Sequence, residues 1–201
     1  MKFLRSMFLI FFAICIFTPT HHADASPVQE QLKITIDKIM EILKDPSFKG
    51  EEQAEERRAS LRKVIKERFS FDKMSQLSLG RHWRERSDEE KKVFIDLFGQ
   101  LLEATYISKI EGYTDEQVVY VKEFVKKKKA QVTTKIVTKT IEIPIAYRMY
   151  NAKDNSWMIY DLVIEGVSLV GNYRSQFDNI LQRDSYDKLV EQLKEKIENG
   201  S

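Results

Sequence analysis

The chain has 201 residues, of which 42% are hydrophobic and 32% are charged, and its formal net charge is only +2. This composition is typical of a folded globular domain, and so small a net charge gives no reason to expect nucleic-acid binding. One cysteine and three histidines exclude an internal disulfide framework and leave few ligands for a zinc site.

The first 25 residues have the three regions of a cleavable signal peptide. Lys2 and Arg5 precede an uninterrupted apolar run at 7–17, and Ala-Asp-Ala at 23–25 is the pattern after which signal peptidase cuts. The apolar run is shorter than the roughly 20 residues that a membrane-spanning helix needs. We therefore expect cleavage after Ala25 and export to a bacterial periplasm, rather than a membrane anchor.

The mature domain would then span residues 26–201 without any cysteine. Cys15 lies within the apolar run, after Ile14 rather than the small residue expected before a lipid-modified cysteine, so a lipoprotein is a weaker alternative. The domain is long enough to bury a substantial core without disulfides. No internal repeat or linker divides it, so we expect one domain and no cofactor.

The N-terminal part of the mature chain is predicted to be helical. Apolar residues recur every three or four positions through 28–44, and Pro46 and Gly50 follow. A strongly charged second helix is expected over 51–68, and a short third helix is expected to end at Gly80.

The strongest amphipathic helix is predicted to begin after Ser87 and to reach about residue 110. Ser87 and Glu90 form an S-x-x-E capping box, with acidic residues at the positive end of the helix dipole. The helix carries a broad apolar stripe, which consists of Phe94, Leu97, Phe98, Leu101, Leu102, Thr105 and Tyr106.

The apolar period changes to alternation in residues 116–150, which are rich in Val, Ile, Thr and Tyr. Four lysines at 126–129 are expected at the solvated end of a hairpin, and a run at 157–165 that is apolar on both faces is expected near the centre of the sheet. One face of the strands is expected to carry Val132, Thr134, Ile136, Ile141, Ile143, Ile145, Tyr147 and Met149.

Helices expected around 172–182 and 185–198 close the chain. Helices followed by antiparallel strands and further helices indicate the α+β class. We expect the N-terminal helices to pack on one face of a curved antiparallel sheet, with the C-terminal helices closing the domain.

Patterns for catalysis are nearly absent from the sequence. His82 is the only histidine outside the predicted signal peptide, and neither a G-x-S-x-G elbow nor a glycine-rich phosphate loop occurs. Asp161 and Glu165 lie four residues apart on an expected strand and could form an acid-base pair. The favoured interpretation is structural, with Asp161 satisfied by Arg148 or Arg174.

Two basic clusters and a large apolar surface remain to be interpreted. The lysines at 126–129 would keep a hairpin soluble or face an anionic partner, and arginines at 81, 84 and 86 flank Trp83 as at some protein interfaces. The apolar helix and strands form either a packed core or the walls of an apolar pocket. Composition alone does not choose between these two arrangements.

Three motifs resemble those of the MlaC family, periplasmic toluene-tolerance and phospholipid-transport components that serve an ABC transporter. They are WMIYDLVIEGVSLVGNYRSQF at 157–177, FSFDKMSQLSLGRHW at 69–83, and FIDLFGQLLEATY at 94–106. The resemblance covers essentially the whole mature chain.

The resemblance implies a non-enzymatic, monomeric carrier with an NTF2-like cone that holds phospholipid tails in an apolar cleft between sheet and helices. It also implies two partners: an outer-membrane lipoprotein-porin complex, and an inner-membrane ABC transporter with an MCE-domain subunit. Arg174 is expected to anchor its motif to Asp161 or Glu165. The residues expected to line the cleft are Phe94, Phe98, Leu102, Tyr106, Ile143, Ile145, Tyr147, Trp157, Ile159, Val163, Val167, Leu169, Tyr173 and Phe177.

Two other functions stay open at the level of sequence. One is a carrier of a different apolar lipid, such as a hopanoid. The other is an NTF2-like enzyme in which Asp161 or Glu165 acts as a base.

Overall fold

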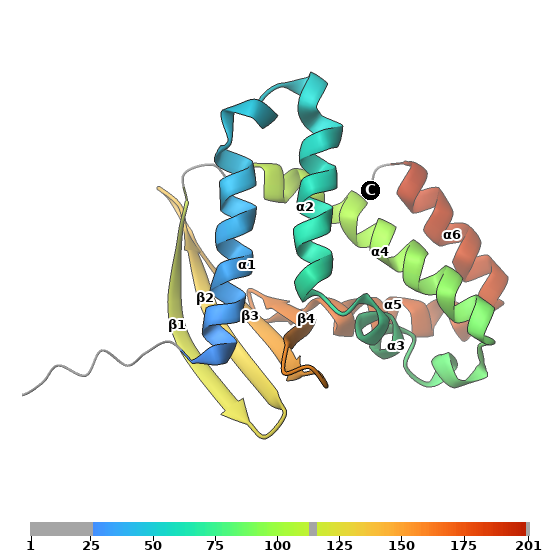
Figure 1. Ribbon diagram of the computed structural model, residues 1–201. Helices are drawn as coiled ribbons and strands as arrows, with labels where there is room; N and C mark the ends of the chain where they lie inside the picture. The colour runs from blue at the N-terminus through green and yellow to red at the C-terminus, as the bar shows by residue number, and fades with distance from the viewer. Residues whose placement is uncertain (1–25, 113–115, 200–201) are drawn as a thin grey trace, which may run out of the picture.

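The computed structural model describes residues 26–112 and 116–199 (Figure 1). The expected signal peptide lies outside these residues. The helices within them are α1 Pro27–Lys44, α2 Ala54–Arg68, α3 Phe71–Leu79, α4 Asp88–Glu111, α5 Leu169–Leu181 and α6 Tyr186–Glu198. The strands are β1 Gln117–Lys126, β2 Lys129–Val137, β3 Glu142–Asn151, β4 Trp157–Ile164 and β5 Val167–Ser168.

The helix starts follow from their caps. Ser87 and Glu90 form both hydrogen bonds of the capping box, which confirms the predicted start of α4. The start of α5 was predicted too late in the sequence. Ser168 Oγ accepts a hydrogen bond from the backbone N–H of Gly171 at 2.9 Å, so the helix already begins at Leu169.

The strands form one antiparallel sheet in the order β1-β2-β3-β4-β5, and this sheet is not closed into a barrel. The hairpin between β1 and β2 turns at Lys127 and Lys128, as the lysine run predicted. Together with the helices, the sheet confirms the α+β class.

The prediction that residues 157–165 form a strand near the centre of the sheet holds only in part, because β4 lies between β3 and β5 but β5 has only two residues. Along β4 the outer neighbours are the two-residue strand β5 and a single parallel bridge between Phe69 and Ile159. Both faces of β4 carry apolar side chains because the helices α1, α2, α3 and α5 contact this strand.

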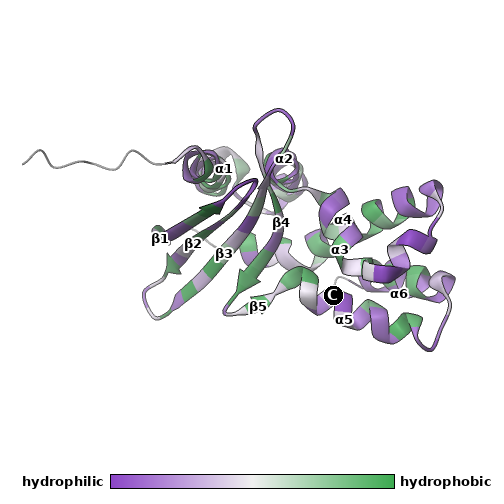
Figure 2. Cartoon of the chain, turned by 90° about the horizontal axis from the view of Figure 1, so that it is seen from below, coloured by the Kyte–Doolittle hydropathy of each residue, from purple (hydrophilic) through white to green (hydrophobic). Residues whose placement is uncertain are grey.

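The helices lie in two places relative to the sheet. Figure 2 shows α1 and α2 over one face of the sheet, and α3 to α6 gathered beside its β4–β5 edge. We call the face under α1 the inner face; it carries Ile145, Tyr147 and Met149. The expectation that helices cover one face therefore holds for α1 and α2, whereas α3 to α6 form a bundle of their own.

The buried core divides into two clusters in the same way. The helix cluster joins α3, α4, α5 and α6, and the sheet cluster joins the inner face to Val28 and Leu32 of α1. Phe69 and Leu162 are half-buried and pack against both clusters. The seam between the two parts of the core therefore runs past these two side chains.

A β-bulge in β4 changes which side chains share a face. Arg148 pairs with Asp161 but Met149 pairs with Ile159, so Tyr160 is an extra residue in β4. Beyond the bulge, Leu162 rather than Val163 lies opposite the inner-face residue Tyr147. Simple alternation along this strand therefore fails at Tyr160.

Candidate functional site

The expected site residues from α4 and α5 form a tightly packed aromatic group. The Phe98 ring lies 5.2 Å from Tyr173 and 5.7 Å from Phe177 between centroids, in edge-to-face contacts. Phe94 also contacts Phe177 edge-to-face at 5.6 Å, and both Phe94 and Phe98 are 0% exposed. Leu102 and Leu169 belong to the same helix cluster, with Tyr106 half-buried at its margin. These side chains face one another across the bundle rather than the strands.

The expected site residues from the strands lie in the other cluster. Ile145, Tyr147, Trp157 and Ile159 are buried on the inner face beneath α1. Ile143 is half-buried at the start of β3. The structure therefore does not bring the expected residues around one common cavity.

Three residues lie elsewhere than alternation or motif position predicted. Val163 pairs with Ala146 and faces away from the inner face, because the bulge at Tyr160 reverses the pattern. Val167 lies in the short edge strand β5 and is 60% exposed. Ile141 precedes β3 and is 57% exposed.

One end of the inner face carries apolar side chains that are only half-buried. Ile143 lies there together with Ile136 of β2 and Ile164 of β4. Ile36 of α1 and Tyr120 of β1 are also half-buried and pack against the sheet cluster. Tyr120 and Ile164 were not among the residues expected from the sequence to line the site, although the alternation of β1 offered a signal for Tyr120. Their incomplete burial leaves an apolar patch partly accessible at this end of the inner face.

The C-terminal half of α4 is held beside α2 by ion pairs. Arg62 pairs with Glu103, and both Arg57 and Arg58 pair with Glu111 at 2.8 and 3.1 Å. Burial raises the pKa of Glu111. The hydrogen bonds from Arg58 and Arg57 and their positive charges together lower this pKa by more than burial raises it, so the pKa lies below its usual value. These contacts fix the part of α4 that carries Tyr106.

Asp161 is the centre of a buried hydrogen-bond network. Its side chain is 4% exposed, and it accepts hydrogen bonds from Arg148 Nη1 at 2.9 Å, Ser168 Oγ at 2.7 Å and Val170 N at 3.0 Å. Arg148 or Arg174 was expected to pair with Asp161, and the structure shows that Arg148 does so. Glu165 is exposed in the turn after β4 with a φ of 51°, so it does not share a strand face with Asp161 as an acid-base pair would.

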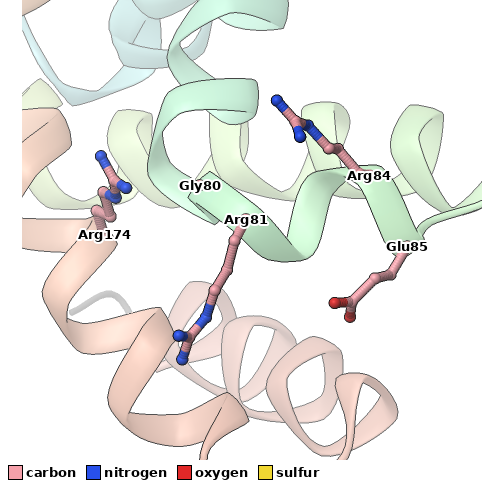
Figure 3. A pocket seen from close by; sticks show the side chains of 5 residues that line it. All are labelled: Gly80, Arg81, Arg84, Glu85 and Arg174. Atoms are coloured by element: carbon pink, nitrogen blue, oxygen red, sulfur yellow. The ribbon is translucent and has the colours of Figure 1, made fainter.

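Arg174 does not anchor its motif to Asp161 or Glu165, contrary to expectation. It lines a surface hollow of about 480 Å³ together with Gly80, Arg81, Arg84 and Glu85 (Figure 3). Its guanidinium lies against Gly80, where an added Cβ would come within 2.9 Å of Nε. This hollow is lined by charged side chains, so its chemistry does not suit an acyl chain.

His82 lies beside this hollow as an ordinary half-buried histidine. Its Nε2 lies 3.0 Å from Asp178 Oδ1, and Arg81 Nη2 also lies 3.0 Å from the same oxygen. In residues 26–112 and 116–199, no group of three metal-binding side chains occurs. Over the same residues, no helix is both long and apolar enough to cross a membrane.

Comparison with known proteins identifies the family. The model of the family described as MlaC protein matches residues 33–195. The chain belongs to the MlaC family. This confirms the resemblance inferred from the three motifs.

Two known proteins are similar to this chain. It is 25% identical over 123 residues to the intermembrane phospholipid transport system binding protein MlaC of Haemophilus influenzae, a match that spans 58% of this chain and 57% of that relative. Its fold is similar to that of the phospholipid-binding protein from Ralstonia solanacearum, whose structure was solved in complex with a phospholipid. That similarity has a TM-score of 0.72 at 22% identity and covers 86% of this chain and 98% of the other.

Proposed function

We propose that this protein is a periplasmic carrier that binds a phospholipid and moves it between the outer and inner membranes. Its membership of the MlaC family is the observation that carries the proposal. The phospholipid bound by the Ralstonia solanacearum protein of the same fold supports the ligand class. The signal peptide expected at residues 1–25 supports the periplasm.

The acyl chains bind on the inner face of the sheet in this proposal. They enter at the half-buried end, beside Ile136, Ile143 and Ile164, and extend toward the seam at Phe69 and Leu162. Leu102 and Tyr106 of α4 belong to the helix cluster beyond this seam, and together with the aromatic group around Phe98 they support the wall of the site from behind. Of the expected residues, the remaining inner-face contacts are Ile145, Tyr147, Trp157 and Ile159.

Burial of the acyl chains supplies the affinity of such a carrier. Each buried methylene contributes about 0.8 kcal/mol, so two long chains need little further recognition. Apolar side chains line the inner face, and the charged hollow around Arg174 lies outside it. We therefore expect slight selectivity among head groups.

The proposed partners are the two membrane complexes of a lipid-transport system. These are an inner-membrane ABC transporter with an MCE-domain subunit, and an outer-membrane lipoprotein-porin complex. The name of the Haemophilus influenzae relative, a binding protein of an intermembrane phospholipid transport system, supports a role of this kind.

Lipid extraction from vesicles tests the proposal. The chain from Ser26 onward, mixed with phospholipid vesicles and separated from them by flotation, is expected to retain phospholipid near one molecule per chain. Ile143→Asp on the inner face should abolish retention, while Val119→Asp on the outer face of β1, where the valine is 44% exposed, should not. Circular dichroism establishes that both variants fold. Absence of lipid from the wild-type fraction, or equal loss in both folded variants, would refute the proposal.

A further inference from the structure

Two buried hydroxyl groups on the inner face have no hydrogen-bond partner in the part of the chain that the structure describes. They are the phenol of Tyr120 on β1 and the side-chain hydroxyl of Thr134 on β2. Thr134 is 0% exposed as a whole residue. Native proteins nearly always satisfy buried polar groups, because an unpaired hydroxyl opposes folding. Two such groups on one face of the sheet therefore require an explanation.

The two hydroxyl-bearing residues are direct neighbours in the sheet. Tyr120 pairs with Thr134 across β1 and β2, and Thr134 pairs with Ile145 across β2 and β3. Ile136, two residues further along β2, shares their face and is half-buried. The two residues therefore lie where the half-buried end of the inner face meets its fully buried part.

The surroundings of the pair indicate what kind of group it would bind. Burial is the main cause that raises the pKa of Tyr120, followed by Tyr147, Asp37 and Glu30, so the phenol keeps its proton and acts as a donor. Asp37, which forms an ion pair with Lys33, and Glu30 both raise the pKa of Tyr120 through their negative charge, so the electric field at the phenol disfavours an anionic phosphate. A neutral group that only accepts hydrogen bonds fits the pair best.

We propose that Tyr120 and Thr134 donate hydrogen bonds to an ester carbonyl of the bound lipid. This inference rests on the proposed function, because it places the ester at the head of acyl chains on the inner face. An ester carbonyl accepts hydrogen bonds and carries no charge, and in a diacyl lipid it adjoins the apolar chain. Pairing with it satisfies two hydroxyls that the protein alone leaves unpaired.

A comparison of ester and ether lipids tests this inference. Vesicles contain equal amounts of a diester and a diether phosphatidylglycerol with matched chains, and the lipid retained by the protein is quantified by mass spectrometry. The wild type is expected to retain the diester about two- to tenfold in preference to the diether, which has no carbonyl. The double variant Tyr120→Phe, Thr134→Val should bind both lipids equally. Thr133→Val, the neighbouring change on the outer face of β2, should keep the preference.

The outcomes separate the two levels of the proposal. If the wild type retains neither lipid, the proposed function fails and the ester inference fails with it. If the wild type retains diester and diether equally, the ester inference alone is overturned. The lipid-free double variant should melt at or above the wild-type temperature, since it loses no hydrogen bond. A clearly lower melting temperature would instead show a structural role for the hydroxyls and overturn the inference.

Discussion

Arg148 Nη1 donates a hydrogen bond to Asp161 Oδ2 at 2.9 Å, between directly paired residues of β3 and β4. The same carboxylate accepts hydrogen bonds from Ser168, the cap of α5, and from the backbone of Val170 in its first turn. One buried carboxylate therefore fastens α5, and through it the helix bundle, to the sheet.

Asp161→Ala is expected to lower the free energy of unfolding by about 2–4 kcal/mol, because it leaves buried donors at Ser168 and Val170 unpaired. Urea unfolding measures the change. Glu142→Ala is the control, since its ion pair with Lys135 is 55% and 42% exposed and should contribute less than about 1 kcal/mol. Equal losses in the two variants would contradict the role given to Asp161.

Gly80→Ala is expected to destabilise the protein by about 1–3 kcal/mol. Gly80 has a φ of 58°, which disfavours any side chain, and the new Cβ would also meet Arg174 Nε at 2.9 Å. Adding Arg174→Ala to the Gly80→Ala variant should recover the stability lost to the contact between the new Cβ and Arg174. It should not recover the stability lost to the strained backbone at residue 80. Arg174→Ala alone should change stability by less than about 0.5 kcal/mol. A large loss of stability in the Arg174→Ala variant would show that Arg174 anchors its motif after all.

Glu111→Gln is expected to destabilise the protein at neutral pH but not in acid. The net pKa of Glu111 lies below its usual value of 4.5 in the folded state, so its contribution to stability is fully present above pH 4.5. This contribution is lost as the pH falls through the lowered folded-state pKa. The difference in unfolding free energy between wild type and variant should therefore shrink below pH 4.5. A difference that stays constant across this range would contradict the ion pairs with Arg57 and Arg58.

Phe98→Ala is expected to lower the unfolding free energy by about 3–5 kcal/mol, because it leaves a cavity among Phe94, Tyr173 and Phe177. Chemical denaturation measures this loss. The variant should still retain phospholipid in proportion to its folded fraction, since the aromatic group supports the wall from behind. Loss of retention in fully folded Phe98→Ala would instead place Phe98 in contact with lipid.

Much of the fold follows from local sequence signals. The capping box at Ser87 and Glu90 marks the start of α4, Gly80 follows the end of α3, and the lysines mark the hairpin turn. Each of these signals lies within a few residues of the feature it specifies. Short-range patterns of this kind are readable without knowledge of the tertiary structure.

The sequence-based predictions failed where the position of a side chain depends on strand register or on packing between distant segments. No glycine or proline marks the bulge at Tyr160, so alternation assigned Val163 to the wrong face. The choice between Arg148 and Arg174 for Asp161 required the pairing of β3 with β4. Sequence periodicity also could not show that the stripe of α4 packs against α5 rather than the strands. It left open whether the apolar surface is a packed core or a pocket, and only the family resemblance favoured the pocket.

Native mass spectrometry of the exported protein tests the central claim most directly. The chain is expressed with its own residues 1–25, purified from a bacterial periplasm without detergent, and its mass is measured together with that of any bound lipid. We predict a chain that begins at Ser26 and carries stoichiometric phospholipid with mixed head groups. A stably folded, lipid-free chain that also takes up no added phospholipid would contradict the account. A hopanoid bound at one molecule per chain would show that the protein carries a different lipid.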